Sequence, residues 1–305
     1  MASLYTHKDS NIRKTWFLIT GFFILTMFLG WFLSYYFNAP GILVIAIAIS
    51  IFMSVGSYWW SDKMVIAMTR AKPVPDEGRF EEIHNIIENL AITAGLPKPK
   101  LYVLEERAPN AFATGRNPEH AVVAVTTGLL EILDRPELEG VLAHEMSHIG
   151  NRDMLVSTVV VVLAGVIIYA TDILFRSMLW GGVGGRNNDS RAGGVIMIVG
   201  LVAMILAPIL ATILKLAVSR KREFLADASG ALLTRYPEGL ASALEKISQD
   251  PTKMRFANNA TAHLFFENPF KADKRGAQDK EVGKFAKLFM THPPVQERVK
   301  ALKEM

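Results

Sequence analysis

Long apolar runs without a charged residue limit the folds that this sequence can adopt. The first run extends from Trp16 to Asn38 and the second from Gly41 to Ser61, with only Ala39-Pro40 between them. A helix of about 20 residues crosses the hydrocarbon core of a bilayer. We therefore predict two membrane spans, at residues 16–38 and 41–61, joined as a hairpin by a very short turn.

The first run is predicted to be a retained anchor. A cleaved signal peptide has a shorter apolar core, followed by small residues at a cleavage site. Tyr58, Trp59 and Trp60 end the second run as an aromatic belt of the kind found at membrane interfaces. The bilayer is therefore an expected partner of this chain.

Two further apolar runs set the predicted domain organisation. They are uncharged from Met154 to Thr171 and from Val195 to Leu214, and we place their spans at about residues 154–174 and 195–218. An alternative is that these two runs pack as a hairpin without fully crossing. The chain then divides into a hairpin at 1–61, a first part of a soluble domain at 62–153, a second hairpin at 154–218 and a second part of that domain at 219–305.

Composition agrees with this division and excludes several partners. Half of the 305 residues are hydrophobic and the mean hydropathy is +0.25, which is too apolar for an ordinary soluble enzyme. The lack of cysteine excludes disulfides and thiolate zinc ligands. No basic stripe with interleaved aromatic residues is present, and the glycines of residues 181–194 lack the Lys-Ser/Thr of a phosphate loop. We expect neither nucleic acid nor nucleotide as a partner.

The motif His144-Glu145-Met146-Ser147-His148 indicates a metal site. Two histidines four residues apart on a helix project from one face, where both imidazoles reach a single Zn²⁺ ion. Glu145 lies beside the first ligand, so its carboxylate can take a proton from the attacking water. The alternative is a helix whose two histidines meet only water or a carboxylate.

Local signals predict the helix that carries this motif. Pro136, a favoured first helical residue, follows Asp134-Arg135, and Gly150-Asn151 offers a stop. Upstream, a helical stripe begins at Phe80 and ends near Gly95. Short strands are predicted at residues 101–104 and 120–125, with residues 110–115 extended between them. Such a sheet can present an edge strand to an extended peptide, although ordinary sheet packing explains these residues equally well.

Basic residues predict the topology, because they gather on the cytoplasmic side of membrane proteins. In a four-span arrangement, one side receives Lys8, Arg13, Lys14, Lys63, Arg70, Lys72, Arg79, Lys215, Arg220, Lys221 and Arg222. The other side receives Arg176, Arg186 and Arg191. We therefore predict a multi-pass protein of the cell membrane with both termini and the motif in the cytoplasm.

Glu223 is the predicted third ligand. A catalytic zinc site needs a third protein ligand and an open position for water. Glu223 lies far from His148 in sequence, but an out-and-back pair of spans returns the chain to the same side of the membrane. Asp227, one turn further, can accept the other N–H of a ligating histidine and fix its tautomer. The alternative for both acids is a solvated helix face.

Taken together, these motifs closely resemble the HtpX family of bacterial and archaeal membrane zinc endopeptidases, which are related to the CAAX prenyl proteases. The matching segments cover nearly the whole chain and are Asn110-Ala111-Phe112-Ala113-Thr114-Gly115, the His144–His148 motif, Ser219–Asp227 and Thr291-His292-Pro293-Pro294. The resemblance implies a mainly α membrane protein with four transmembrane helices and a cytosolic, zincin-like (gluzincin) α+β metallopeptidase domain with a small β-sheet.

The same resemblance implies residue roles. His144, His148 and Glu223 hold one Zn²⁺, and Glu145 is the catalytic base. His292 either donates a hydrogen bond to the oxyanion or only begins a final helix that contains Val295, Val299 and Leu302. Asn110 is the substrate-binding candidate. The remaining histidines have no partner at ligand spacing and are interpreted as structural or surface residues: His7, His84, His120 and His263.

The implied function is quality control of membrane proteins, with damaged or misassembled membrane proteins as substrates. Two alternatives are a membrane scaffold or transporter with a structural metal and a lipid-anchor-peptide protease with the same chemistry. The spans hold almost no ionisable residues, which argues against transport. Residues 256–290 are apolar in part and densely charged in part, and they form either a lid over the cleft or a long surface loop.

Overall fold

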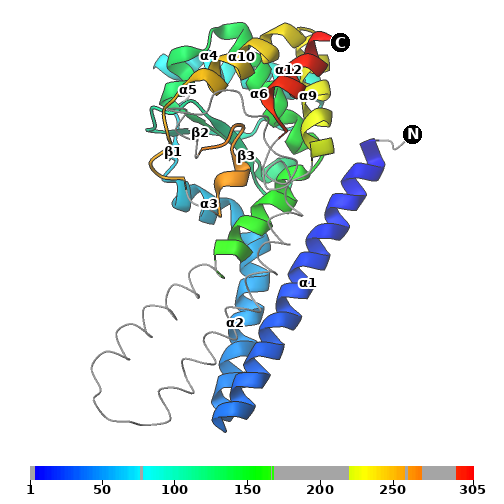
Figure 1. Cartoon of the computed structure of the whole chain (residues 1–305), viewed down its shortest axis with the longest axis vertical. Coiled ribbons are helices and arrows are strands. Elements are labelled where there is room, and N and C mark those ends of the chain that lie inside the picture. Colours follow the sequence, from blue (N-terminus) through cyan, green and yellow to red (C-terminus); the bar gives the residue numbers. More distant parts are fainter. Residues whose placement is uncertain (1–3, 76–77, 166, 168–219, 258–259, 270–292) are drawn as a thin grey trace, which may run out of the picture.

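The structure is a computed structural model of the whole chain, and a compact domain lies at one end of two long helices (Figure 1). It describes the chain except for residues 1–3, 76–77, 166, 168–219, 258–259 and 270–292. The predicted span at 195–218, residues 166 and 168–174 of that at 154–174, and His292 lie outside the described residues. Those predictions therefore stay predictions.

The first two apolar runs form a helical hairpin. It consists of α1 (Leu4–Phe37) and α2 (Pro40–Trp59), which run side by side (Figure 1). Pro40 occupies the first turn of α2, where its missing N–H costs no helical hydrogen bond. The stretches Asp9–Tyr35 and Pro40–Trp59 are long and apolar enough to cross a membrane, and only 22% of each apolar window is buried. A core helix would be mostly buried, so these exposed apolar faces indicate association with a membrane.

The hairpin enters the domain through α3 (Ser61–Thr69). Near this entry, the guanidinium of Arg116 stacks on the Trp59 ring at 4.8 Å from its centroid, and its Nη1 donates to Trp59 O over 2.9 Å. The end of α2 is therefore tied directly to the domain.

A four-stranded sheet forms one layer of the domain. Its strands are β1 (Lys72–Pro73), β2 (Lys100–Leu104), β3 (Ala111–Thr114) and β4 (Val122–Thr126), in the order β1-β2-β4-β3. β2 and β4 are parallel, and the two outer pairs are antiparallel. The predicted strands are confirmed, and β3 is an edge strand.

Helices cover the sheet and surround α6, which carries the motif. Besides α6 (Arg135–Gly150), the domain contains α4 (Glu81–Ala94), α5 (Thr127–Ile132), α9 (Arg220–Thr234), α10 (Pro237–Gln249), α12 (Val295–Lys303) and the short η1 (Gly78–Phe80), η2 (Pro118–His120) and η3 (Ala262–Leu264). α6 contacts α4, α9, α10 and β3. A separate apolar helix, Asp153–Gly165, follows α6 toward the hairpin.

The start and stop signals predicted for α6 are confirmed. Asp134 is the N-cap and forms a capping box with Glu137, in which each side chain accepts the backbone N–H of the other residue, and Asn151 is the C-cap. Two glycines allow close helix packing: a Cβ at Gly140 would lie 2.8 Å from the Leu240 nitrogen of α10, and one at Gly230 of α9 would lie 3.0 Å from the His144 nitrogen. α9 and α10 therefore pack directly against the backbone of α6.

Candidate active site

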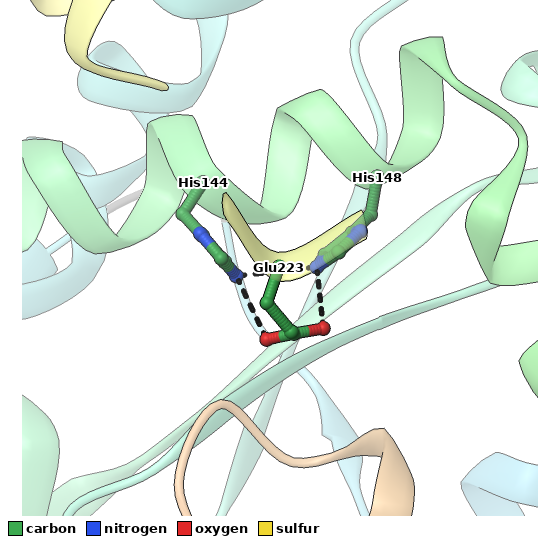
Figure 2. Close-up of side chains that lie close together, drawn as sticks. All are labelled: His144, His148 and Glu223. Carbon is green, nitrogen blue, oxygen red and sulfur yellow. Dashed lines mark hydrogen bonds and ion pairs between the residues drawn. The ribbon is translucent and has the colours of Figure 1, made fainter. Parts of the chain in front are cut away.

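The two motif histidines converge from one face of α6 (Figure 2). Their Nε2 atoms are 3.1 Å apart. His144 is 1% exposed, and His148 is partly open. The four-residue spacing therefore places both imidazoles around one point.

Glu223 reaches the same point from the first turn of α9 (Figure 2). Its Oε2 is 3.9 Å from His144 Nε2, and its Oε1 is 3.8 Å from His148 Nε2. The ligand atoms of these three residues all lie within 4.8 Å of one another. The sequence predicted this meeting, and the structure brings all three side chains together.

The donor set fits zinc. Two Zn–N bonds of about 2.05 Å at a tetrahedral angle place the nitrogens about 3.3 Å apart, close to the 3.1 Å between the two Nε2 atoms. Each Nδ1 faces an aspartate, so each Nε2 is free to present its lone pair to an ion. Two imidazoles and one carboxylate leave the fourth position open, as in catalytic rather than structural sites.

Asp227 and Arg298 support His144 from behind. Asp227 Oδ1 is 2.9 Å from His144 Nδ1, where the sequence had predicted a carboxylate. Arg298 of α12 donates to both oxygens of Asp227, from Nη2 over 2.6 Å and from Nε over 2.8 Å. Its side chain is completely buried. Arg298 was not predicted from the sequence, although its place beside Val299 and Leu302 on the buried face of the final helix was a usable signal.

Charge and burial around His144 keep its imidazole neutral. Burial lowers the pKa of His144 to about 4, although the hydrogen bond to Asp227 opposes this shift. Burial alone would raise the pKa of Asp227, but the charge of Arg298 and its hydrogen bonds lower it to about 2. The result is an ionised carboxylate that accepts the Nδ1 proton of a neutral imidazole.

His148 has a different support, which the sequence did not predict. Asp153, at the start of the apolar helix Asp153–Gly165, places Oδ2 3.3 Å from His148 Nδ1. Its Oδ1 accepts a hydrogen bond of 2.7 Å from Asn11 Nδ2 of α1 and lies 3.7 Å from Arg222 Nη1. Burial alone would lower the pKa of His148, but the hydrogen bond to Asp153 and the negative charges around it raise the pKa to about 9.

Glu145 is buried at the cleft. It is 2% exposed and lines the cleft together with the three metal-ligand candidates. Its charge is among those that raise the pKa of His148, so it lies close to the metal site. The cleft has a cavity volume of about 30 Å³, which holds water but no peptide.

A segment that begins in η3 closes one side of this cleft. His263, Leu264, Phe265 and Phe266 line it, and the Phe266 ring lies edge to face with His144 at 5.1 Å between centroids. Phe265 and Phe266 are 1% and 2% exposed. This described part of residues 256–290 therefore packs into the core over the site. His263 had been interpreted as a structural or surface residue, but it lies at the cleft.

Asn110 lies beside this segment, away from the metal ligands. Its Nδ2 donates to Glu267 O over 2.8 Å, and its Oδ1 accepts from Glu267 N over 3.1 Å. The side chain thus pairs with a peptide backbone, here that of the chain itself. Of the other histidines, His84 is buried in α4 and His120 contacts Asn117 and Arg116.

Comparisons with known proteins identify relatives of this chain. A family model described as Peptidase family M48 matches residues 77–305. The Protease HtpX homolog of Thermoanaerobacter pseudethanolicus is 46% identical over 307 residues, covering 99% of this chain and 98% of that protein. The Protease HtpX homolog of Pyrococcus furiosus is 45% identical over 275 residues, covering 90% of each. The crystal structure of S. mikatae Ste24p aligns with 93% of this chain and 67% of that chain at 18% identity and a TM-score of 0.46.

Proposed function

The chain belongs to the HtpX proteases of peptidase family M48, and we propose that it cleaves damaged or misfolded membrane proteins in segments exposed at the cytoplasmic face of the cell membrane. It is a membrane zinc metalloprotease. The observation that carries the proposal is the convergence of His144, His148 and Glu223 beside a buried Glu145.

The proposed roles follow from the positions of the side chains. His144, His148 and Glu223 hold one Zn²⁺. When bound, zinc supplies a Lewis acid that polarises the scissile carbonyl and lowers the pKa of water to about 7. Glu145 takes the proton of the attacking water and passes it to the departing amine. Asp227 holds the Nδ1 proton of His144, so its Nε2 keeps a lone pair for the metal.

An extended substrate pairs with the outer edge of β3 in this proposal. Thr126 N–H donates to Asn110 O over 3.0 Å, so the backbone groups of Asn110 and of every second residue after it face β4. Those of Ala111 and Ala113 then point away from the sheet. The antiparallel register of β3 and β4 supports this alternation.

Only part of that edge is open. The outward groups of Ala111 are occupied, because its N–H donates to Asn110 Oδ1 and its C=O accepts from Phe266 N over 2.8 Å. Ala113 lines the cleft, and its outward groups have no partner within the part of the chain that the structure describes. We propose that Ala113 pairs with the substrate backbone near the scissile bond, and that Asn110 binds the peptide as it now binds Glu267.

The proposed topology has four spans, with boundaries at 1–61, 62–153, 154–218 and 219–305. The described helices support it, because the N-terminal part of α1, the end of α2 and the start of helix Asp153–Gly165 all meet the domain (Figure 1). A cytoplasmic site follows from the basic residues at these ends. His292 remains the proposed oxyanion donor.

Substitution of Glu145 tests the proposed chemistry. Purified Glu145→Gln should keep its zinc, because residue 145 is not a ligand, and should lose cleavage of a model membrane protein by at least about 100-fold. Glu139→Gln on the same helix is the matched control and should cleave as wild type does. Equal cleavage by wild type and Glu145→Gln would favour a scaffold with a structural metal.

The ligand set is tested separately. Glu223→Ala should purify with little zinc, because two imidazoles alone bind the ion weakly. It should not regain cleavage at the zinc concentration that restores the chelated wild type. A chelator should inactivate the wild type, and zinc should restore it. Undiminished zinc in Glu223→Ala would remove this residue from the ligand set.

A further inference from the structure

Asn11 is a buried amide in the first membrane helix. It is 3% exposed, whereas Asp9 and Arg13 on either side are exposed. A buried amide is retained in a structure only where its hydrogen bonds are satisfied. The partners of Asn11 therefore indicate why an amide stands at this position.

Both partners belong to the connection that follows the motif helix. Asn11 Nδ2 donates to Asp153 Oδ1 over 2.7 Å and to Asn151 O over 3.1 Å. Asn151 is the C-cap of α6. One amide thus holds both the end of the motif helix and the first residue of the next helix, from 140 and 142 residues away in sequence.

Asp153 transmits this contact to a metal ligand. Its Oδ1 is held by Asn11, which leaves Oδ2 turned toward His148 Nδ1 at 3.3 Å. The other ion pair that Oδ1 makes within the described residues is with Arg222 at 3.7 Å, a distance too long for a hydrogen bond. Without Asn11, the carboxylate could therefore rotate away from His148.

Apolar packing holds α1 beside the start of the helix Asp153–Gly165. Leu18, Ile19 and Phe22 of α1 are buried against the helix Asp153–Gly165, in one cluster with Val156 and Val160. These apolar contacts begin two turns after Asn11 on the same face of α1. The helix is therefore held against the start of Asp153–Gly165 and does not merely tether the domain.

We propose that Asn11 is a positioning residue of the metal site, which acts through Asp153 to orient the imidazole of His148. The membrane anchor is then part of the structure that sets zinc affinity. This inference rests on the proposed zinc site. Loss of a residue that orients a metal ligand typically lowers metal affinity about 10- to 100-fold. Asn11 acts one contact further away, so we expect about a 5- to 10-fold loss for Asn11→Ala.

Zinc affinity of the full-length protein in detergent tests the inference, measured by competition with a chromophoric chelator. Asn11→Ala should bind zinc about 5- to 10-fold more weakly than wild type. Asn11→Asp should bind still more weakly, because it sets a second carboxylate against Asp153. Thr15→Val is the matched control: Thr15 is also buried on this face of α1, but among the described residues its hydroxyl donates only to Asn11 O within the helix. It should bind zinc as wild type does.

Two further measurements separate positioning from general destabilisation. In an Asp153→Asn background, Asn11→Ala should change zinc affinity less than twofold, because its route to His148 is already broken. The visible absorption of the Co²⁺-loaded protein should change in Asn11→Ala and not in Thr15→Val. Two results would overturn this inference and leave the proposed function intact. One is that wild type binds zinc tightly and Asn11→Ala binds it equally well, and the other is that the losses of zinc affinity in the double variant are additive. Failure of wild type to bind zinc would instead overturn the proposed function.

Discussion

The two histidines of the site are supported by different parts of the molecule. His144 rests on Asp227 and Arg298, which come from α9 and α12 of the domain. His148 rests on Asp153, at the start of the apolar helix Asp153–Gly165, and on Asn11 of the candidate membrane helix α1. We call the first set the domain support and the second the membrane support.

The domain support is the tighter of the two. Its contacts are 2.6, 2.8 and 2.9 Å long, and two of them join the buried charges of Arg298 and Asp227. In the membrane support, Asn11 donates to Asp153 over 2.7 Å, but Asp153 is 3.3 Å from His148 and 3.7 Å from the charge of Arg222. Short charge-assisted hydrogen bonds are stronger and more directional than long ones. His144 is therefore held more rigidly than His148.

The pKa values follow the same division. Burial holds the pKa of His144 at about 4, whereas the negative charges around His148 raise its pKa to about 9. In the metal-free protein at neutral pH, His144 is therefore neutral and His148 carries a proton. His144 can therefore bind a metal ion without losing a proton. His148 must first release the proton that Asp153 of the membrane support stabilises.

Removal of Arg298 is expected to have the largest effect on the domain support. Arg298→Leu leaves the charge of Asp227 buried and unpaired, and breaking a buried ion pair in this way costs about 3–5 kcal/mol. Denaturant unfolding of the metal-free protein in detergent measures the loss of free energy of unfolding.

Lys300→Leu, on the exposed face of α12, is the matched control and should unfold as wild type does, because its contact with Glu304 is a surface ion pair. A loss below about 1 kcal/mol in Arg298→Leu would mean that the domain support is not the tighter one.

The pH dependence of zinc binding tests the charge difference. Zinc binds neutral imidazole, so His148 must release its proton at any pH below about 9, while His144 has none to release above about 4. Apparent affinity should rise about tenfold per pH unit from 6.5 toward 9 and then level off. The sign for folding is opposite: the raised pKa of His148 stabilises the metal-free fold below its ordinary pKa, and this stabilisation is lost as the pH rises through 9.

Asp153→Asn supplies the internal control for this pH series. It removes the negative charge of Asp153, which raises the pKa of His148 and strengthens the hydrogen bond between them, so zinc affinity should level off at a lower pH than in wild type. Zinc affinity that stays flat between pH 6.5 and 8.5 in wild type would contradict the assignment of the proton to His148.

Matched substitutions of the two aspartates compare the supports directly. Asp227→Asn and Asp153→Asn should each lower zinc affinity about 10- to 100-fold at pH 8, with the greater loss for Asp227→Asn because its contact is shorter. Asp62→Asn in the first turn of α3 should have no effect. The same chelator competition gives all three values, and a greater loss for Asp153→Asn would reverse the comparison.

The domain support was partly visible in the sequence, because it follows helical spacing. The His-Glu-x-x-His spacing predicted one shared face, and Asp227 was placed one turn after Glu223. Both predictions use only the repeat of the helix. The boundaries of α6 were predicted correctly for the same reason, since caps and Pro136 act over three or four residues.

The membrane support was not visible, because no local rule relates its members. Asn11 and Asp153 meet across 142 residues, and their contact depends on how α1 packs beside the helix Asp153–Gly165. Arg298 was missed for a similar reason, being 71 residues from Asp227. Phe266 lies over the cleft because its backbone N–H donates to Ala111 O at the edge of β3. The apolar sequence around Phe266 does not predict this pairing.

The smallest expected effect concerns the far end of α6, which belongs to the domain alone. Glu137 completes the capping box with Asp134 and accepts hydrogen bonds of 2.6 Å from both Ser242 and Lys246 of α10. Glu137→Ala removes the carboxylate that accepts from Asp134 N–H, Ser242 and Lys246, although Asp134 still accepts the backbone N–H of residue 137. This loss should lower the free energy of unfolding by about 1–2 kcal/mol. Glu137→Gln should cost less, because glutamine can keep the capping box.

Neither Glu137 variant should change zinc affinity by more than about twofold, since residue 137 lies two helical turns, about 10 Å, before His144. In this respect the start of α6 differs from its end, where Asn11 holds Asn151. Denaturant unfolding and chelator competition on the same samples measure both quantities. A zinc affinity that fell together with stability in Glu137→Ala would mean that any loosening of α6 disturbs the site, and the distinction between the two supports would then no longer hold.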